Sequence, residues 1–167
     1  YEYQAYDIAK HLDEYISETE STDFFHPIEA GKTGIVSYVL DGYESVNESA
    51  ISDTVFDQTT YSSTNLLNSE LINRGDAAYK LIKSDIWYIY IQLDENQAAA
   101  LADSTSINVN FINNNIQCNA DFSQITSGGK TYGRIKLTKY MINFIEDRYV
   151  NIEISENNVS GLKIPVS

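Results

Sequence analysis

The sequence is poor in the residues that crosslink a chain, bind metals or cross a membrane. Its single cysteine, Cys118, cannot form a disulfide within the chain, so no covalent framework holds the fold. No apolar run approaches the roughly 18 residues of a membrane-spanning helix. The two histidines, His11 and His26, belong to no H-E-x-x-H or C-x-x-C pattern, so we expect no metal site.

Basic residues are also scarce, and this scarcity excludes a class of partner. Lysine and arginine total 11 against 24 acidic residues, which gives a net charge of −13. Such a chain is repelled by phosphate backbones, so we expect no nucleic-acid partner. The acidity is uneven: residues 1–57 carry 13 carboxylates and two lysines, whereas residues 58–167 carry 11 carboxylates and nine basic residues.

Signatures of catalysis and of nucleotide binding are missing as well. The sequence contains no G-x-S-x-G elbow and neither of the glycine-rich phosphate patterns. Carboxylate pairs such as Asp94/Glu95 and Glu146/Asp147 are expected by chance in so acidic a chain. We therefore expect no enzyme, no catalytic residue, no cofactor and no metal ligand.

The apolar residues that are present indicate one helix followed by β-structure. Residues 4–20 place apolar side chains three and four positions apart, which predicts an amphipathic helix that ends before His26-Pro27. The β-branched run 34–40 predicts a strand, with a turn at Asp41-Gly42. Residues 44–70 are polar and predict a surface insertion, with a short helix near Asn65–Leu71.

The second half of the sequence predicts a small antiparallel barrel over residues 84–155. The apolar segment 86–93 is typical of a strand covered on both faces, and Asp94 with Gln97 forms a capping-box pattern for a short helix. Further strands follow by alternation, over 107–111, 116–122, 132–137 and 150–154. A sandwich is the alternative architecture. The 13 tyrosines suggest a ligand platform, but strand packing is the favoured explanation for Tyr38, Tyr79, Tyr88 and Tyr90.

The residues that we single out are therefore structural and lie in turns. Asp41 and six glycines have this role, because a glycine is favoured where the backbone turns tightly or approaches a neighbour. The glycines are Gly34, Gly42, Gly75, Gly128, Gly129 and Gly161.

Three of these motifs, taken in order, resemble one known family. The run Gly34–Glu44 (GIVSYVLDGYE) resembles a strand of a lipoyl-like barrel-sandwich hybrid domain. Residues 74–88, from Arg74-Gly75-Asp76 to Ile86-Trp87-Tyr88, look like the turn and aromatic start of a β-barrel. The ending 160–167 (SGLKIPVS) looks like the exit toward a membrane-proximal domain. The chain thus resembles the haemolysin-D-type membrane fusion proteins, or periplasmic adaptor subunits, in their divergent Gram-positive branch.

This resemblance implies a mainly β fold with an N-terminal amphipathic helix. Residues 1–25 would end a helical hairpin, and 26–84 would form half of the lipoyl-like hybrid with a polar insertion at 44–70. Residues 85–157 would form the β-barrel, and 158–167 would begin a membrane-proximal segment. The Asp41-Gly42 turn has no lysine, which disfavours a lipoyl or biotinyl carrier.

The function implied by the resemblance is non-enzymatic. We expect an adaptor of an efflux or secretion transporter that docks on an inner-membrane transporter subunit and forms a homo-oligomer. It would be extracytoplasmic and held at the cell membrane through an anchor outside these residues. The alternative is a secreted or wall-associated β-rich module that binds a glycan or a peptide.

Overall fold

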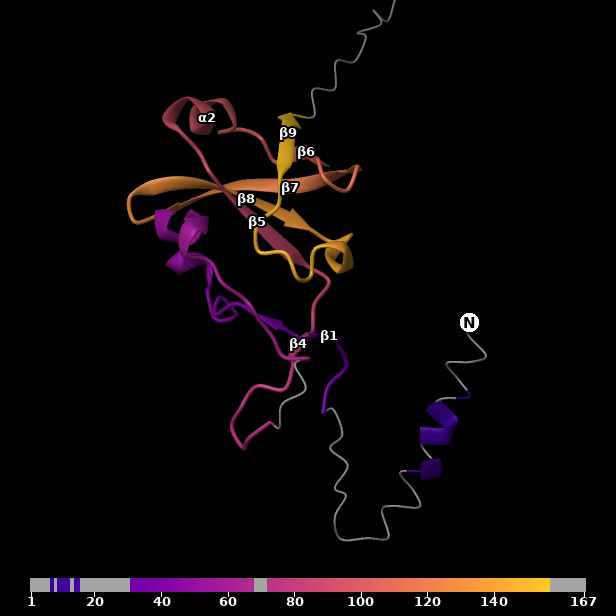
Figure 1. Cartoon of the computed structure of the whole chain (residues 1–167). Helices are drawn as coiled ribbons and strands as arrows, with labels where there is room; N and C mark the ends of the chain where they lie inside the picture. The colour runs from indigo at the N-terminus through magenta and orange to yellow at the C-terminus, as the bar shows by residue number, and fades with distance from the viewer. Residues whose placement is uncertain (1–6, 8, 13, 16–30, 68–71, 157–167) are drawn as a thin grey trace, which may run out of the picture. The chain divides into compact units, whose positions relative to one another are not determined.

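The computed structural model describes residues 7, 9–12, 14–15, 31–67 and 72–156 (Figure 1). The chain divides into two units, Tyr1–Thr33 and Gly34–Ser167. Most of the helix predicted over 4–20 lies outside the described residues, as do Gly161 and the segment 158–167. None of the described helices is long and apolar enough to cross a membrane.

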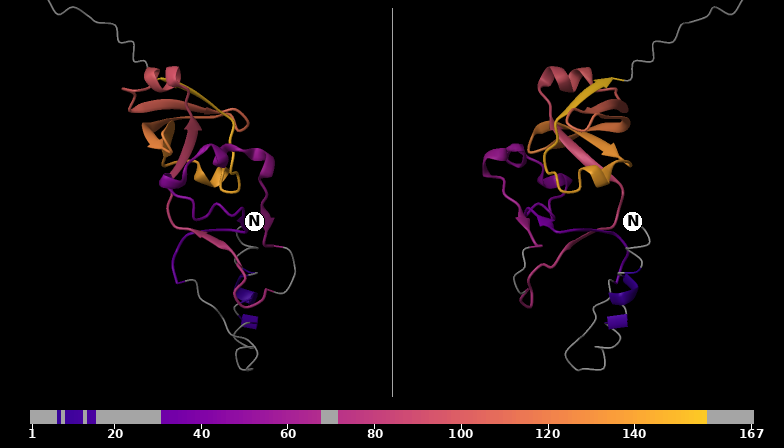
Figure 2. Two further views of the ribbon diagram at one scale, coloured as in Figure 1. Left: turned by 90° about the vertical axis from the view of Figure 1, so that its left-hand side faces the viewer. Right: turned by 45° about the vertical axis from the view of Figure 1, so that its right-hand side comes forward.

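The second unit is mainly β, as predicted, and is built around one curled sheet that forms half of a barrel (Figures 1 and 2). Its strands run in the order β5-β8-β7-β6-β9 and all pair antiparallel. They are β5 (Trp87–Gln92), β6 (Ser106–Phe111), β7 (Ile116–Ser127), β8 (Lys130–Leu137) and β9 (Ile152–Glu156). Strands β5 and β9 are the two edges, so the sheet stays open between them.

The concave face of the sheet holds the core. Ile107, Val109 and Phe111 alternate along β6 and are almost completely buried, as their spacing predicts. Phe144, from the irregular segment before β9, closes one end of the core. Its ring lies 4.3 Å from that of Phe111 and 5.4 Å from that of Trp87, between centroids. The buried core residues are Ile107, Val109, Phe111, Ala120, Phe122, Ile135, Leu137 and Phe144.

Local sequence signals set the connections between these strands. Helix α2 (Glu95–Ala100) begins at the predicted capping box, in which the Asp94 side chain accepts from the Gln97 backbone N–H at 2.8 Å. In return, the Gln97 side chain accepts from the Asp94 N–H at 3.0 Å. Gly128 and Gly129, with φ of 58° and 77°, form the two-residue turn between β7 and β8. Two positive φ angles match the right-handed twist of a hairpin, which explains the glycine pair.

Residues 34–82 form two small strand pairs, where the sequence predicted one continuous strand and a helix. Strand β1 (Ile35–Ser37) pairs with β4 (Lys80–Ile82), and β2 (Val39–Leu40) pairs with β3 (Thr64–Asn65). The predicted strand over 34–40 is interrupted at Tyr38, where the Ser37 hydroxyl accepts from the Val39 N–H at 3.2 Å. Asn65, expected in a helix, lies in β3 instead.

The segment 41–61, which we call the strap, contains most of the described part of the polar insertion predicted over 44–70. It contains three short 3-10 helices: η1 (Glu48–Ala50), η2 (Asp53–Phe56) and η3 (Gln58–Thr60). Asn47 caps η1 through the Ser49 N–H, and Asp57 caps η3 through the Thr59 N–H. The polar residues of the predicted insertion at 44–70 thus include helix caps, and most of residues 42–60 are exposed.

Candidate binding cavity

The turn residues predicted from the sequence lie apart and do not form a site. Gly42 and Gly75 have φ of 81° and 103°, as the turns require. Gly34 lies where a Cβ atom would be 2.5 Å from the Ile82 carbonyl oxygen, so close strand approach explains it. Asp41 is the exception, because its carboxylate also joins the strap to the barrel.

Asp41 forms a two-pronged ion pair with Arg148. Nε and Nη2 of Arg148 donate to the Asp41 carboxylate at 2.7 and 2.8 Å, and the backbone N–H of Tyr43 donates at 3.0 Å. The Asp41 side chain is only 7% exposed. Burial raises its pKa, but the hydrogen bonds from Arg148 and Tyr43 outweigh burial and hold the pKa below its ordinary value.

Two more carboxylates of the strap contact cations on the outer face of β8. Glu48 accepts from Arg134 Nη1 at 2.8 Å. Asp53 pairs with Lys130 and also accepts from the Tyr132 hydroxyl at 2.9 Å. Because all three cations follow residue 129, the acidic first part of the chain is paired with the more basic second part.

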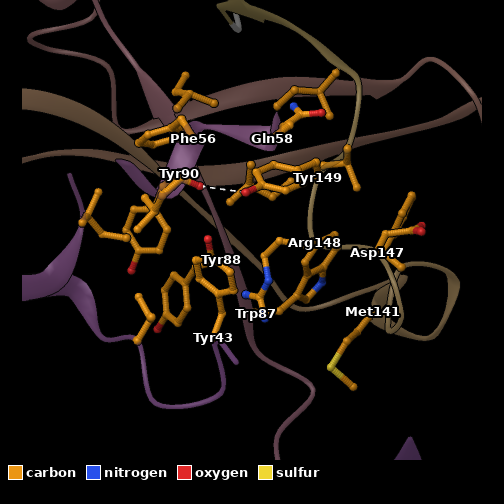
Figure 3. A pocket seen from close by; sticks show the side chains of 18 of the residues that line it. Tyr43, Phe56, Gln58, Trp87, Tyr88, Tyr90, Met141, Asp147, Arg148 and Tyr149 are labelled. Carbon is orange, nitrogen blue, oxygen red and sulfur yellow. Dashed lines mark hydrogen bonds between the residues drawn. The ribbon is translucent and has the colours of Figure 1, made fainter. Parts of the chain in front are cut away.

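Aromatic contacts support these ion pairs. Phe56 of η2 stacks on Tyr132 with ring centroids 5.6 Å apart, and Tyr61 meets Tyr149 edge to face at 5.3 Å. The Tyr149 hydroxyl donates to the Val55 carbonyl at 3.1 Å (dashed in Figure 3). These contacts explain why Tyr132 is buried although its side chain lies on the outer face of β8.

A cavity of about 600 Å³ lies between the strap, β5 and the segment 141–152 (Figure 3). Seven aromatic residues line it, and Arg148 lies between Tyr43 and Trp87 in the close view. The guanidinium of Arg148 is 5.1 Å from the centre of the Tyr43 ring, within the range of a cation–π contact. The aromatic lining residues are Tyr43, Phe56, Trp87, Tyr88, Tyr90, Phe144 and Tyr149.

The cavity follows the open edge of β5. All six residues of β5 line it, although alternate side chains of a strand point to opposite faces. A cavity that contacts all six residues must therefore run along the edge of β5. This edge faces the gap in the half-barrel. The prediction that this strand is covered on both faces was wrong, because Tyr88, on the face away from the core, is 46% exposed.

The lining of this cavity is mainly apolar and aromatic. Asp147 is the one carboxylate among its described lining residues, so a pair of facing carboxylates is not formed there. Burial, and then the nearby charge of Glu48, raises the pKa of Tyr90, which keeps its hydroxyl neutral. Within the described ranges, no cluster of three His, Cys, Asp or Glu side chains is placed to hold a metal.

Sequence reasoning missed both the cavity and the residues that hold the strap. The abundance of tyrosine was a signal for the cavity, but we favoured packing in the core as its explanation. Tyr38, Tyr79 and Tyr88 are instead exposed. The uneven charge of the two parts of the chain was the signal for the ion pairs.

Fold and site define a mainly β protein with an open half-barrel and an aromatic cavity at its edge. Comparison with known protein families, characterised proteins and solved structures finds no match.

Proposed function

We propose that this chain is part of a non-enzymatic adaptor that docks on an inner-membrane transporter subunit and assembles with copies of itself. The proposal rests on the order of its parts: short strand pairs lead into a half-barrel whose first strands are separated by a short helix. These parts include the motifs at 34–44 and 74–88 by which the sequence resembles the membrane fusion proteins. The protein would act outside the cytoplasm in efflux or secretion.

The apolar surface of the β1–β4 pair supports a docking role. Ile35, Val36 and Tyr79 are 36%, 45% and 45% exposed on or beside these strands. A two-stranded ribbon alone is marginally stable in water, so apolar side chains on it favour contact with another surface. An adaptor needs such faces, because shape and surface chemistry set its specificity.

In-cell photo-crosslinking of the full-length protein tests the adaptor proposal. A photoreactive residue at Val36 should capture a transporter subunit and a second copy of the chain. The same residue at Asn119, exposed on β7, is the matched control and should capture neither. Capture of neither protein from Val36, with the protein correctly located and folded, would contradict the proposal.

The cavity supports a second candidate function, a module that binds a glycan or a peptide. Seven aromatic side chains around one cavity offer stacking surfaces for sugar rings or apolar side chains. Titration with wall glycan fragments and peptides, followed by Trp87 fluorescence, tests this candidate. Saturable binding that is lost in Tyr88→Ala would favour the module, whereas an unchanged signal would remove it.

A further inference from the structure

The ion pairs that we describe are distributed unevenly over the molecule. Of the four recorded among the described residues, three join a carboxylate of the strap to a cation of the barrel or of the segment before β9. The fourth, between Asp121 and Lys136, joins two neighbouring strands of the sheet. Charge pairing is therefore concentrated where the strap meets the rest of the unit.

Apolar burial contributes little to this contact. Ile51 is the single buried residue of the strap, and most of the others are exposed. Its 3-10 helices are three or four residues long, too short to be stable by themselves. The strap is thus held by a few ring contacts, a few hydrogen bonds and three ion pairs, and two of these pairs are substantially exposed to solvent.

The strap also forms one wall of the cavity. Tyr43, Val46, Ile51, Val55, Phe56 and Gln58 line the cavity from this side. The opposite wall contains Trp87, Tyr88 and Tyr90 of β5. Movement of the strap away from β8 would therefore open the cavity and expose the edge of β5.

We infer that the strap is a lid over the aromatic cavity and that its two exposed ion pairs, Glu48–Arg134 and Asp53–Lys130, are an electrostatic latch. Exposed ion pairs weaken as salt screens them, whereas the paired strands of the barrel are insensitive to salt on this scale. The lid therefore opens as ionic strength rises, without unfolding of the sheet. This inference concerns the strap itself and stands whether or not the chain serves a transporter.

Hydrogen exchange, read by mass spectrometry on the whole chain, tests the latch. Amides of residues 48–60 should exchange about threefold to tenfold faster in 500 mM than in 20 mM NaCl, as expected for a few exposed pairs. Amides of β6, β7 and β8 should not change. Acrylamide quenching of Trp87, the only tryptophan, should increase in parallel because the ring lines the cavity.

Matched variants separate the latch from a general effect of charge. Glu48→Gln combined with Asp53→Asn removes two latch carboxylates, and should raise strap exchange at low salt and reduce its salt dependence. Asp121→Asn removes the carboxylate of the pair outside the strap and should leave strap exchange unchanged. Salt-independent strap exchange in the wild type, or an equal effect of Asp121→Asn, would overturn the inference. So would exchange that rises equally in the barrel strands, because this indicates global unfolding.

Discussion

The guanidinium of Arg148 donates two hydrogen bonds to the carboxylate of Asp41, which lies 107 residues earlier in the sequence. Asp41 belongs to a turn after β2, and Arg148 belongs to the irregular segment before β9. The pair therefore connects the short strand pairs to the open end of the half-barrel. The stability of that connection can be measured residue by residue.

Replacing Arg148 with methionine should destabilise the protein by about 2–3 kcal/mol, because it leaves the nearly buried Asp41 carboxylate without its cation. Arg148→Lys keeps the charge but loses the planar two-pronged geometry, so it should recover part of the loss. Urea unfolding measures the free energy of unfolding of both variants. Lys136→Met, at an exposed pair, is the control and should cost under about 1 kcal/mol.

The ion pair of Asp41 should also make the free energy of unfolding depend on pH in the acidic range. Because the folded-state pKa of Asp41 lies below 3.8, its ionised form stabilises the fold above that value. The contribution falls as pH drops through the lowered pKa. The difference in unfolding free energy between the wild type and Asp41→Asn should thus be constant near neutrality and shrink below about pH 4. A difference that keeps its neutral-pH value down to pH 2.5 would contradict this assignment. The groups that act on Asp41 are Arg148, the Tyr43 N–H and Lys80, with Tyr61 and Glu44 also near the pair.

Gly133 lies on the core face of β8, where a side chain has no room. A Cβ atom there would lie 2.7 Å from Ile91 Cγ1 and 2.9 Å from Phe122 Cε2. Gly133→Ala should therefore destabilise the protein by about 1–3 kcal/mol in thermal or urea unfolding. Gly31→Ala, where a Cβ atom meets nothing within 4 Å, should change stability by less than about 0.5 kcal/mol.

Cys118 should behave as an unreactive thiol in the folded protein. Partial burial raises its pKa above 9.0, and the residue packs against the core. Little thiolate is present at pH 8, so a disulfide reagent should react at least about tenfold more slowly than with the urea-unfolded chain. Equal rates in the two states would show that the thiol is freely accessible.

The barrel was predictable because its signals are local. Alternation located Ile107, Val109 and Phe111 on one face, and the pattern from Asp94 to Gln97 located the start of α2. The strap and the cavity were not predictable, because they depend on contacts between residues that are far apart in the sequence. Such contacts leave no repeating pattern of apolar residues within a segment. Tyr132 illustrates the difference: its strand was predicted, but its burial depends on Phe56, which a polar segment carries.

The two-residue turn at Gly128-Gly129 has a consequence for the order of folding. It joins β7 to β8 with the shortest loop in the sheet, so this hairpin can form early, whereas β5 and the strap must close much longer loops. We expect contacts such as Asp41–Arg148 to be absent from the folding transition state. Asp41→Asn should then speed unfolding and leave the refolding rate nearly unchanged in stopped-flow experiments, whereas Gly129→Val should slow refolding. The lifetime of the native state would then depend on the strap, and the speed of reaching it on the hairpin.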